Sequence, residues 1–436
     1  MPRPPITLFS LTLCCLAAPL AAAQEPLSSL ATPPMTSDVS PERQPLTLVE
    51  AYALALKQSE TIAIKGEVLK ETEGRFLQAL AGALPQVSFK DSEKRQDGTG
   101  SSSFTLRNIP ERKFTFSQPL FSGFKEFAAM AGARAEHRER VHDKARAEQL
   151  LLIDVANAFY LLLKQRETLN AYEVIRLALI ERIDELDGRE RLGRSRRSER
   201  VSAEVQVRRT LADVEAVRRD EALARKLLAF LIGRDPAEGV VAPASSLPPL
   251  DDLSTYVAKA DHRSDVLAAE EAWHVTQKQV AIAHADFWPN VSAEGNYYTK
   301  RVGVAQNVKW DVLLMVDVPL FQGGKAVGAA REASAKEREA KLELARVRRA
   351  ASLEIQDAYE KLRVAMKRAA TLEQAVASAE ENYRLQRDDY RLSLVNNLEV
   401  LQALQSLQDT RLDLIAARYE AKRLYWELRT ATGETL

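Results

Sequence analysis

Residues 308–325 read VKWDVLLMVDVPLFQGGK, and this stretch decides the fold. Up to residue 318 the side chains alternate between an apolar set and a set that includes a lysine and two aspartates. An alternation of period two predicts a strand with two different faces. One face holds Val308, Trp310, Val312, Leu314, Val316 and Val318, and the other holds Lys309, Asp311, Leu313, Met315 and Asp317.

The same features occur 200 residues earlier in the chain. Residues 119–125 (PLFSGFK) correspond to residues 319–325 (PLFQGGK), and Gly233 corresponds to Gly433 at the same offset. Such self-similarity predicts two structural copies, 46–250 and 251–436. In each copy we expect a helical stretch (46–83 and 251–286), two short strands, a very long helix, a turn and a second long helix.

The long helices are predicted from proline-free stretches and from a heptad pattern. Residues 123–187 and 324–388 contain no proline, and at ~1.5 Å per residue each runs for roughly 100 Å. In the second copy a seam with spacings of three and four residues predicts coiled-coil packing. Its members are Ala358, Leu362, Ala365, Ala369, Leu372, Val376, Ala379 and Tyr383. Such a narrow apolar stripe needs partner helices, within the chain and between chains.

The strands indicate a membrane face. Six apolar residues on one side of 308–318 and charges on the other fit a barrel strand with lipid outside and water inside. On the water side we expect Glu294, Asp311 and Asp317, and Trp288, Tyr297, Tyr298 and Trp310 are candidate interfacial aromatics. For 308–318 alone, a hairpin on an ordinary soluble sheet is the alternative. Four strands cannot close a barrel, since the smallest need about eight, so an oligomer is required.

The beginning of the chain is predicted to direct export. Residues 1–23 have an apolar run and an Ala-rich end, as a secretory signal peptide does. The only cysteines, Cys14 and Cys15, lie inside it. We expect cleavage without lipid attachment, although the sequence alone does not decide whether a lipid anchor is present. Residues 24–45 are predicted to be a flexible leader, because prolines, Ser and Thr dominate them.

Composition argues against several functions. The 61 basic and 61 acidic side chains give a formal net charge of zero, which offers no basic face for nucleic acid. The glycines at 323–324 lack the spacing of a phosphate loop, and the five histidines form no group with metal-ligand spacing. We therefore expect no catalytic site, no cofactor and no metal, so the chain is predicted not to be an enzyme.

Taken together, these features resemble the TolC-like outer-membrane efflux protein family from Leu46 to Gly433. The motifs that carry the resemblance are TLVEAYALAL at 47–56, the prolines at strand entry (Pro85 and Pro289), the paired PLF…G elements and the tandem hairpins. The resemblance implies a homotrimer in which each subunit gives four strands to one outer-membrane barrel. It also implies a long periplasmic helical tunnel that meets a periplasmic adaptor (membrane fusion protein) and an inner-membrane pump.

The family closes the periplasmic end of its tunnel with polar residues near the helical turns. By resemblance, Glu199, Glu399 and Tyr390 are candidates for this aperture. The chain departs from the family pattern, with Ser393 in place of a glycine and Val395 in place of a gating arginine, so the family's ion-pair lock is open to question. Glu399 also has a simpler role available, because Asn396 and Glu399 have the spacing of a capping pair.

The predicted fold is mainly α with a small membrane β-barrel part. The protomer is a tandem duplication with four strands and long coiled-coil hairpins, which trimerises into a β-barrel and α-helical-barrel duct. The predicted function is passive conduction of substrates in a tripartite efflux or type I secretion system. The alternative is a periplasmic coiled-coil adaptor or scaffold. The exported substrate, the pump and the adaptor cannot be read from the sequence.

Overall fold

The computed structural model describes residues 46–97, 106–236, 240–241 and 247–436. The chain separates into the units Met1–Gln44 and Pro45–Leu436, and every element below belongs to the second. The predicted signal peptide, 1–23, and leader, 24–45, lie outside the described residues. Among the described residues, no helix has the length and apolar character required to cross a membrane.

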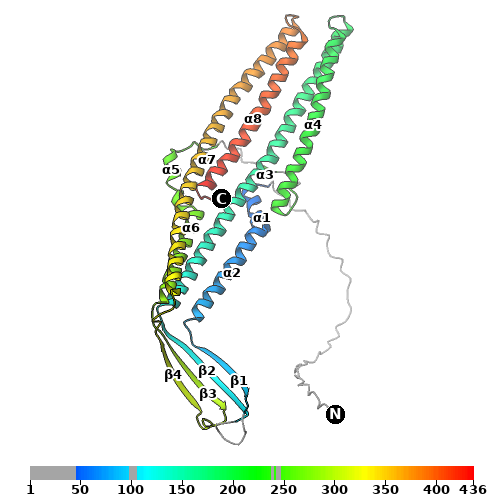
Figure 1. Ribbon diagram of the computed structural model, residues 1–436. Coiled ribbons are helices and arrows are strands. Elements are labelled where there is room, and N and C mark those ends of the chain that lie inside the picture. The colour runs from blue at the N-terminus through cyan, green and yellow to red at the C-terminus, as the bar shows by residue number, and fades with distance from the viewer. Residues whose placement is uncertain (1–45, 98–105, 237–239, 242–246) are drawn as a thin grey trace, which may run out of the picture. The chain divides into compact units, whose positions relative to one another are not determined.

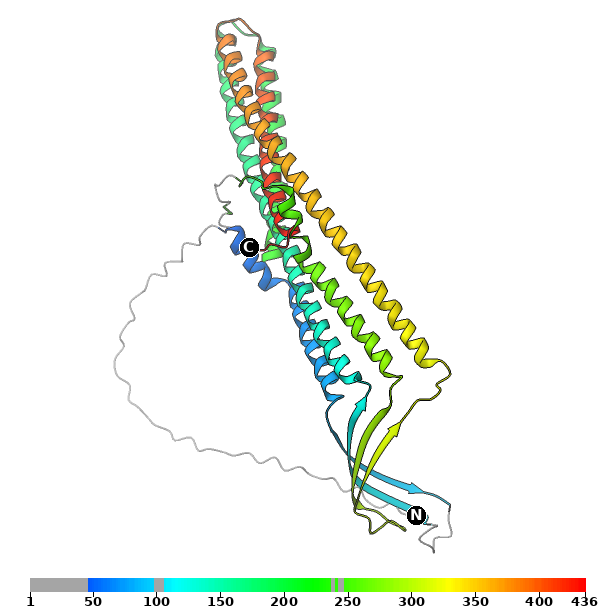
Figure 2. The same ribbon diagram turned by 90° about the vertical axis from the view of Figure 1, so that its left-hand side faces the viewer.

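In its described residues the first copy contains four helices and two strands, all labelled in Figure 1. Its elements in order are α1 (Leu48–Gln58), α2 (Glu60–Ala81), β1 (Gln86–Arg95), β2 (Asn108–Ser122), α3 (Lys125–Arg191) and α4 (Arg197–Ile232). Helices α3 and α4 form a long hairpin whose turn lies at the opposite end of the unit from the strands (Figures 1 and 2).

The second copy repeats this order. Its elements are α5 (Leu253–Val257), a 3-10 helix (Ala260–His262), α6 (Ser264–Ala285), β3 (Asn290–Lys300), β4 (Trp310–Asp317), α7 (Lys325–Arg391) and α8 (Asn397–Ala431). Helix α7 begins and ends 200 positions after α3, and both have 67 residues. The tandem duplication predicted from the sequence is therefore present in the backbone.

The opening helical stretch of each copy differs from the prediction, because it is broken. In the first copy Ser59 adopts an extended conformation between α1 and α2, and its hydroxyl accepts a hydrogen bond from the amide of Ile62 at 3.4 Å. A serine in this position starts a new helix, since it satisfies one of the amides that have no partner within the helix. In the second copy Arg263 occupies the corresponding break, without a side-chain cap.

The four strands form one antiparallel sheet in the order β1-β2-β3-β4. Phe114 of β2 lies opposite both Phe89 of β1 and Tyr297 of β3, and Tyr297 lies opposite Trp310 of β4. One face of the sheet is therefore apolar across all four strands, as the alternation predicts. Proline 119 sits at a register shift in β2, where the ladder is irregular.

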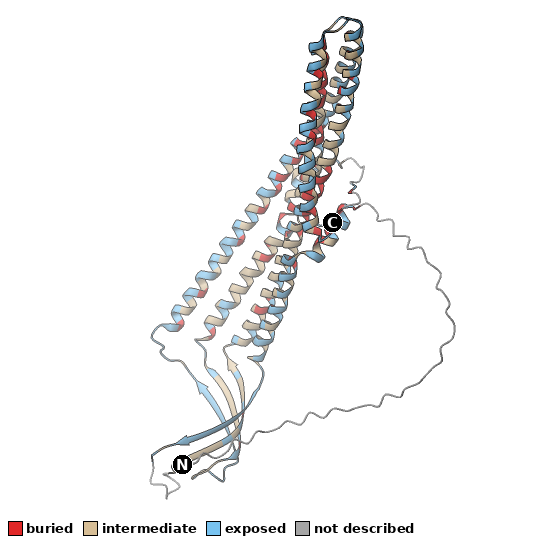
Figure 3. Cartoon of the chain, turned by 90° about the vertical axis from the view of Figure 1, so that its right-hand side faces the viewer, coloured by how far each residue is buried: buried red, intermediate tan, exposed pale blue. Residues whose placement is uncertain are grey.

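The apolar core runs as a stripe along the helices and not as a compact centre (Figure 3). The predicted seams supply it in equivalent places. Val155, Leu162 and Leu228 of the first copy are fully buried, and so are Ile355, Leu362 and Leu428 at the same positions of the second. The first set packs with α1 and the second with α6. Nearer the tips the two copies share a core, where Leu179 and Leu186 of α3 pack against Leu404 and Val400 of α8.

A charged knot lies beside the core of the second copy. The fully buried Arg263 donates to the carboxylates of Asp265 (2.6 Å) and Glu354 (2.7 Å), and to the carbonyl oxygens of Ala351 (3.4 Å) and Ala431 (3.2 Å). These bonds join α6, α7 and the end of α8. Burial alone would raise the pKa of Asp265, but the hydrogen bonds from Arg263 and its charge lower that pKa.

Candidate functional site: the strand faces and the hairpin tips

The polar face of the sheet carries a hydrogen-bonded network across three strands. Asn296 of β3 donates to Asp311 of β4 at 2.9 Å, and Thr115 of β2 donates to Asn296 at 3.0 Å. The hydroxyl of Tyr298 donates to the other oxygen of Asp311 at 2.9 Å. Arg301 lies 4.0 Å from Asp311 and stacks over the ring of Tyr298 at 4.1 Å. Asp311 is thus held in a fixed position on this face.

The three predicted water-facing carboxylates share the polar face but do not meet. Glu294 lies opposite Ser117 and Leu313, in the middle of the sheet. Asp317 lies opposite Asn290 at the helical end of β4, and six residues along the strand separate it from Asp311. At about 3.3 Å per residue this is a separation of roughly 20 Å. The carboxylates are therefore spread along the face and do not form one acidic cluster.

The apolar face is almost bare in the single chain. Trp310, Val312 and Leu314 are 67, 69 and 62 % exposed, and Val316 is 58 % exposed. Val308 and Val318 flank β4 and are 45 and 51 % exposed. An exposed apolar surface of this extent is typical of contact with a membrane or with another protein. One predicted interfacial aromatic is misplaced, because Tyr298 is only 9 % exposed and lies on the polar face with Asp311.

The tips of the two hairpins are turns of the same kind. Gly193 has a left-handed backbone (φ 68°), and its counterpart Ser393 has nearly the same angle (φ 64°). In both turns the next amide bonds back across the end of the helix, from Arg194 to Arg189 O and from Leu394 to Asp389 O, at 2.9 Å each. This arrangement satisfies carbonyls that would otherwise lack partners.

Two of the three predicted aperture residues meet between the tips. The hydroxyl of Tyr390, at the end of α7, donates to Glu199 of α4 at 3.0 Å, and Ser195 donates to the same oxygen at 3.0 Å. Burial, with a further contribution from Glu199, raises the pKa of Tyr390. The hydroxyl therefore keeps its proton and stays a donor at neutral pH. We call the contact between Tyr390 and Glu199 the tip latch.

Glu399 does not take part in the tip latch. Its backbone amide bonds to the side chain of Asn396, and its carboxylate accepts from the amide of Asn396, both at 3.2 Å. This is a complete capping box at the start of α8. The side chain is exposed, so the structure gives Glu399 the capping role that its spacing also predicts.

Two arginines of α3 hold the ring of Tyr390, and the sequence alone did not identify them. The guanidinium groups of Arg182 and Arg189 lie 3.8 and 4.5 Å from the ring centre. Arg189 also donates to the carbonyls of Tyr390 (3.3 Å) and Arg391 (3.4 Å), the last carbonyls of α7. A cation at the C-terminal end of a helix is favourable. Both arginines belong to the first hairpin, so the positive charge around Tyr390 comes from α3.

Asn397 completes the contact between the hairpins. Its amide donates to the backbone carbonyl of Glu199 at 3.2 Å and accepts from Arg182 at 3.0 Å. Arg182 and Asn397 are 4 and 3 % exposed. The signal that would have revealed Arg182 is its position next to the seam residue Ile183, where a charged side chain needs a partner.

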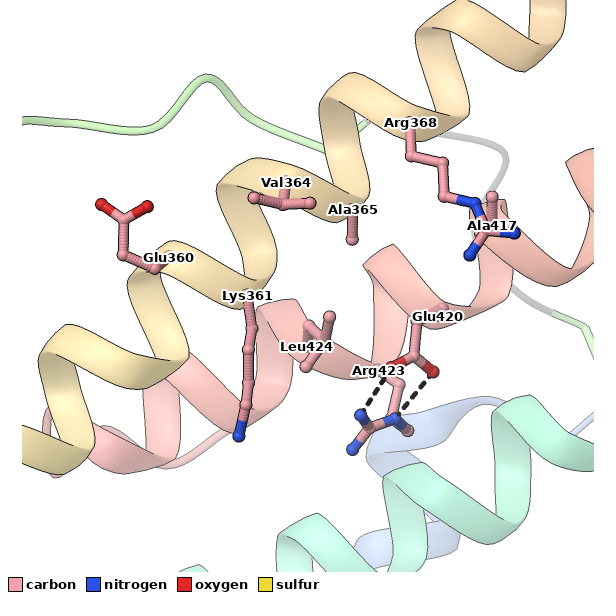
Figure 4. A pocket seen from close by; sticks show the side chains of 9 residues that line it. All are labelled: Glu360, Lys361, Val364, Ala365, Arg368, Ala417, Glu420, Arg423 and Leu424. Atoms are coloured by element: carbon pink, nitrogen blue, oxygen red, sulfur yellow. Dashed lines mark hydrogen bonds and ion pairs between the residues drawn. The ribbon is translucent and has the colours of Figure 1, made fainter.

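A groove of about 510 Å³ lies between α7 and α8 in the second copy (Figure 4). Val364, Ala365 and Leu424 contribute its apolar wall, and Arg423 pairs with Glu420 at 2.7 Å beside it. Apolar residues with ion pairs at the margin are typical of a seam between two helices. In the described residues no group of three or more His, Cys, Asp or Glu side chains could hold a metal ion.

Several solved structures of outer-membrane proteins have a similar fold. The outer membrane protein VceC from Vibrio cholerae superposes with a TM-score of 0.77 and 22 % identity, over 88 % of this chain and 96 % of VceC. The Campylobacter jejuni CmeC outer membrane channel gives 0.75 and 15 % identity, over 88 and 85 %. The open state of the Neisseria gonorrhoeae MtrE outer membrane channel gives 0.74 and 18 % identity, over 88 % of each. The described chain thus has the fold of an outer-membrane channel subunit.

The second copy also matches a family by sequence. Residues 256–434 match the family model described as outer membrane efflux protein. The resemblance predicted from the sequence is confirmed, as is the mainly α fold with one small four-stranded sheet. A comparison with curated protein sequences found no match.

Proposed function

We propose that this chain is one subunit of an outer-membrane channel that conducts substrates passively in a tripartite efflux or type I secretion system. The observation that carries the proposal is the four-stranded sheet. It exposes Trp310, Val312 and Leu314 on one face, and it holds Asp311 in a polar network on the other. A strand with these two faces suits a wall between lipid and water. The family match and the similarity of the fold to outer-membrane channels support the same function.

The edges of the unit support a homotrimer. Within the described residues β1 pairs only with β2, and β4 pairs only with β3. Open edges cannot remain exposed inside a bilayer, because their amides and carbonyls would lack partners. We infer that β4 of one subunit pairs with β1 of the next, and that three subunits close one barrel. Helices α2 and α7, which adjoin the same edges (Figure 2), then meet in the periplasmic tunnel.

The tip latch is proposed to close the periplasmic aperture. It joins the end of α7 to the start of α4, so an outward movement of the second hairpin breaks the bond between Tyr390 and Glu199. In a trimer three such contacts surround the axis. Glu399 is proposed to add negative charge at the same end, and Glu294, Asp311 and Asp317 to line the barrel. Val308, Trp310, Val312, Leu314, Val316 and Val318 are proposed to face lipid.

The proposed location is the outer membrane, with the helical part in the periplasm. The partners are a periplasmic adaptor and an inner-membrane pump, which supplies the energy. We propose the copies 46–250 and 251–436 as the structural divisions, after a cleaved signal peptide and a leader. The second candidate function, a periplasmic scaffold, uses the same hairpins but leaves the apolar face of the sheet without a role.

Planar-bilayer conductance of the purified protein tests the proposal, with Asp311→Asn and Glu399→Gln as variants. Discrete conductance steps are expected, and Asp311→Asn is expected to lower the preference for cations because the barrel loses three carboxylates per trimer. Glu399→Gln keeps the capping box, since glutamine also fits it, and removes only the charge. A change in conductance then reports an acidic ring at the aperture.

A trimer without conductance points to a closed aperture, and Tyr390→Phe is then expected to open it. A protein that forms neither a trimer nor channels, with or without Tyr390→Phe, contradicts the proposal and favours the scaffold.

A further inference from the structure

The turn of the first hairpin is strongly basic. Residues 191–200 contain five arginines and one glutamate, whereas residues 391–400 of the second hairpin contain one arginine and one glutamate. Arg191 pairs with Asp187 at 2.6 Å, and Arg200 pairs with Glu190 at 2.9 Å. The remaining three, Arg194, Arg196 and Arg197, are exposed and have no ion pair within the described residues. We call these three the basic tip.

The basic tip does not serve the stability of its own helix. Arg196 is the residue that precedes α4, and Arg197 is its first residue, with no side-chain cap. Positive charge is unfavourable at this end of a helix, which already carries partial positive charge. The equivalent position in the second copy is Asn396, which makes the favourable capping box. Two unpaired cations in an unfavourable place, Arg196 and Arg197, need another explanation.

The neighbouring tip has the opposite character. Leu392, Leu394 and Leu398 of the second hairpin are 71, 71 and 61 % exposed. The two tips are joined by the tip latch and by the bonds from Arg189 to the end of α7. The two hairpin turns lie at the same end of the unit (Figures 1 and 2), so that end carries both cationic and apolar side chains. Arginine beside a small apolar patch is the composition of protein–protein contact sites.

We infer that the basic tip is a docking surface for a protein segment that presents carboxylates, in an end-on contact with the turn of the first hairpin. The planar guanidinium group pairs with carboxylate through two parallel hydrogen bonds, and all three cations here are arginines and none is a lysine. The left-handed turn at Gly193 shapes the short backbone segment that carries all three arginines.

A protein fits this surface better than a membrane does. The strands lie at the far end of α3, which at ~1.5 Å per residue is roughly 100 Å long, so the basic tip cannot touch the membrane that would hold the strands. The inference rests on the proposed function only in that the tip then lies in the periplasm and faces the partner that delivers substrate.

Binding of defined probes to the full-length purified protein tests the inference. The probe is a synthetic antiparallel helical hairpin with three glutamates in its turn, and a second hairpin carries three glutamines instead. Fluorescence anisotropy at low and high salt is expected to show at least tenfold tighter binding of the glutamate hairpin, weakening as salt rises. Arg196→Gln/Arg197→Gln is expected to remove most of this difference.

The matched control is Arg208→Gln/Arg209→Gln. It removes an equally exposed pair of arginines from the same helix, three turns away, and is expected to leave binding within twofold. A reversed tip, Arg194→Glu/Arg196→Glu/Arg197→Glu, is expected to prefer a hairpin with three arginines. The inference is overturned if both tip variants bind the glutamate hairpin as the unmodified protein does. It is also overturned if vesicles with phosphatidylglycerol displace that hairpin from the tip.

Conductance separates this inference from the proposed function. The tip variants are expected to form channels in planar bilayers as the unmodified protein does. Channels with no selective binding at the tip refute the docking surface and leave the channel intact. If the unmodified protein forms no channel and no trimer, the proposed function fails, whatever binds at the tip.

Discussion

The two copies of the repeat share the lengths of their long helices and the positions of their buried seams, but different contacts hold the break before α2 and the equivalent break before α6. In the first copy Ser59 caps α2 with one hydroxyl. In the second copy the buried Arg263 binds two carboxylates and two carbonyls. The comparison teaches that the apolar seam determines the fold of both copies, whereas the polar contacts at the helix break can differ between them.

The hairpin tips differ in a similar way. The backbone of the turn is the same in both copies, with left-handed residues at 193 and 393. The side chains placed on it are basic and unpaired in the first copy, and apolar with a capping box in the second. A conserved backbone plan with divergent side chains is what we expect if the two tips contact different parts of a partner.

The largest expected effect is at the charged knot. Arg263→Met removes the guanidinium group that binds two carboxylates and two backbone carbonyls, and among the described residues it leaves the carboxylates only the longer pairs with Arg146, at 3.9 and 3.5 Å. Losing one member of a buried ion pair costs about 3–5 kcal/mol. Ser59→Ala, at the matching break, removes one cap and costs about 1 kcal/mol. Chemical denaturation of the purified protein measures both. If the two changes lower the free energy of unfolding equally, the charged knot stabilises the second copy no more than the Ser59 cap stabilises the first.

The same knot predicts a dependence on acid. The pKa of Asp265 is lowered in the folded chain, so its contribution to stability is complete above the ordinary value of about 4 and is lost as pH falls through the lower folded value. The difference in unfolding free energy between the unmodified protein and Arg263→Met is expected to shrink only in this acid range. If the difference disappears near neutral pH, the ion pair between Arg263 and Asp265 is not its cause.

The second expected effect concerns the apolar face, which both copies share. Phe114 of β2 and Leu314 of β4 are equivalent positions and are 40 and 62 % exposed. Phe114→Arg and Leu314→Arg are each expected to prevent assembly, because an arginine on the lipid side costs about 2–4 kcal/mol near the middle of a bilayer. Trimer yield after membrane extraction measures this.

The neighbouring residue Leu313 provides the control. It lies on the polar face opposite Glu294, so Leu313→Arg is expected to leave the trimer yield nearly unchanged. If Leu313→Arg and Leu314→Arg impair assembly equally, the two faces have been assigned wrongly.

The third expected effect tests the tip latch. Tyr390→Phe removes the bond to Glu199 but keeps the ring between Arg182 and Arg189. A hydrogen bond to a charged group contributes about 1.5–3 kcal/mol, so the fraction of open channels is expected to rise tenfold or more. Bilayer recordings measure it. Tyr383→Phe serves as the control, because within the described residues the Tyr383 hydroxyl makes no hydrogen bond; an equal response of both variants would refute the latch.

Much of the fold could be predicted from the sequence because it is repeated. The alternation at 308–318 and the offset of 200 residues predicted β4, the duplication and both long hairpins. The breaks at Ser59 and Arg263 were missed, because a helix pattern continues through a single extended residue. At the site, Tyr390 and Glu199 were named as candidates, yet their contact was not predicted. The roles of Arg182 and Arg189 depend on how two hairpins pack side by side, and periodicity within one helix does not contain that information.

The smallest expected effect exchanges the residues of the two turns. Gly193 and Ser393 have the same left-handed backbone, which costs a residue with a side chain about 1 kcal/mol more than glycine. A Cβ added at Gly193 would meet no atom within 4 Å, so only the backbone angle decides the outcome. Gly193→Ser is therefore expected to loosen the first tip, and Ser393→Gly to tighten the second, because in both cases the left-handed turn favours glycine. The rates of amide hydrogen exchange at Arg194 and Leu394 measure the two tips separately. If both substitutions change the exchange rate in the same direction, the two turns are stabilised by different interactions in spite of their common geometry.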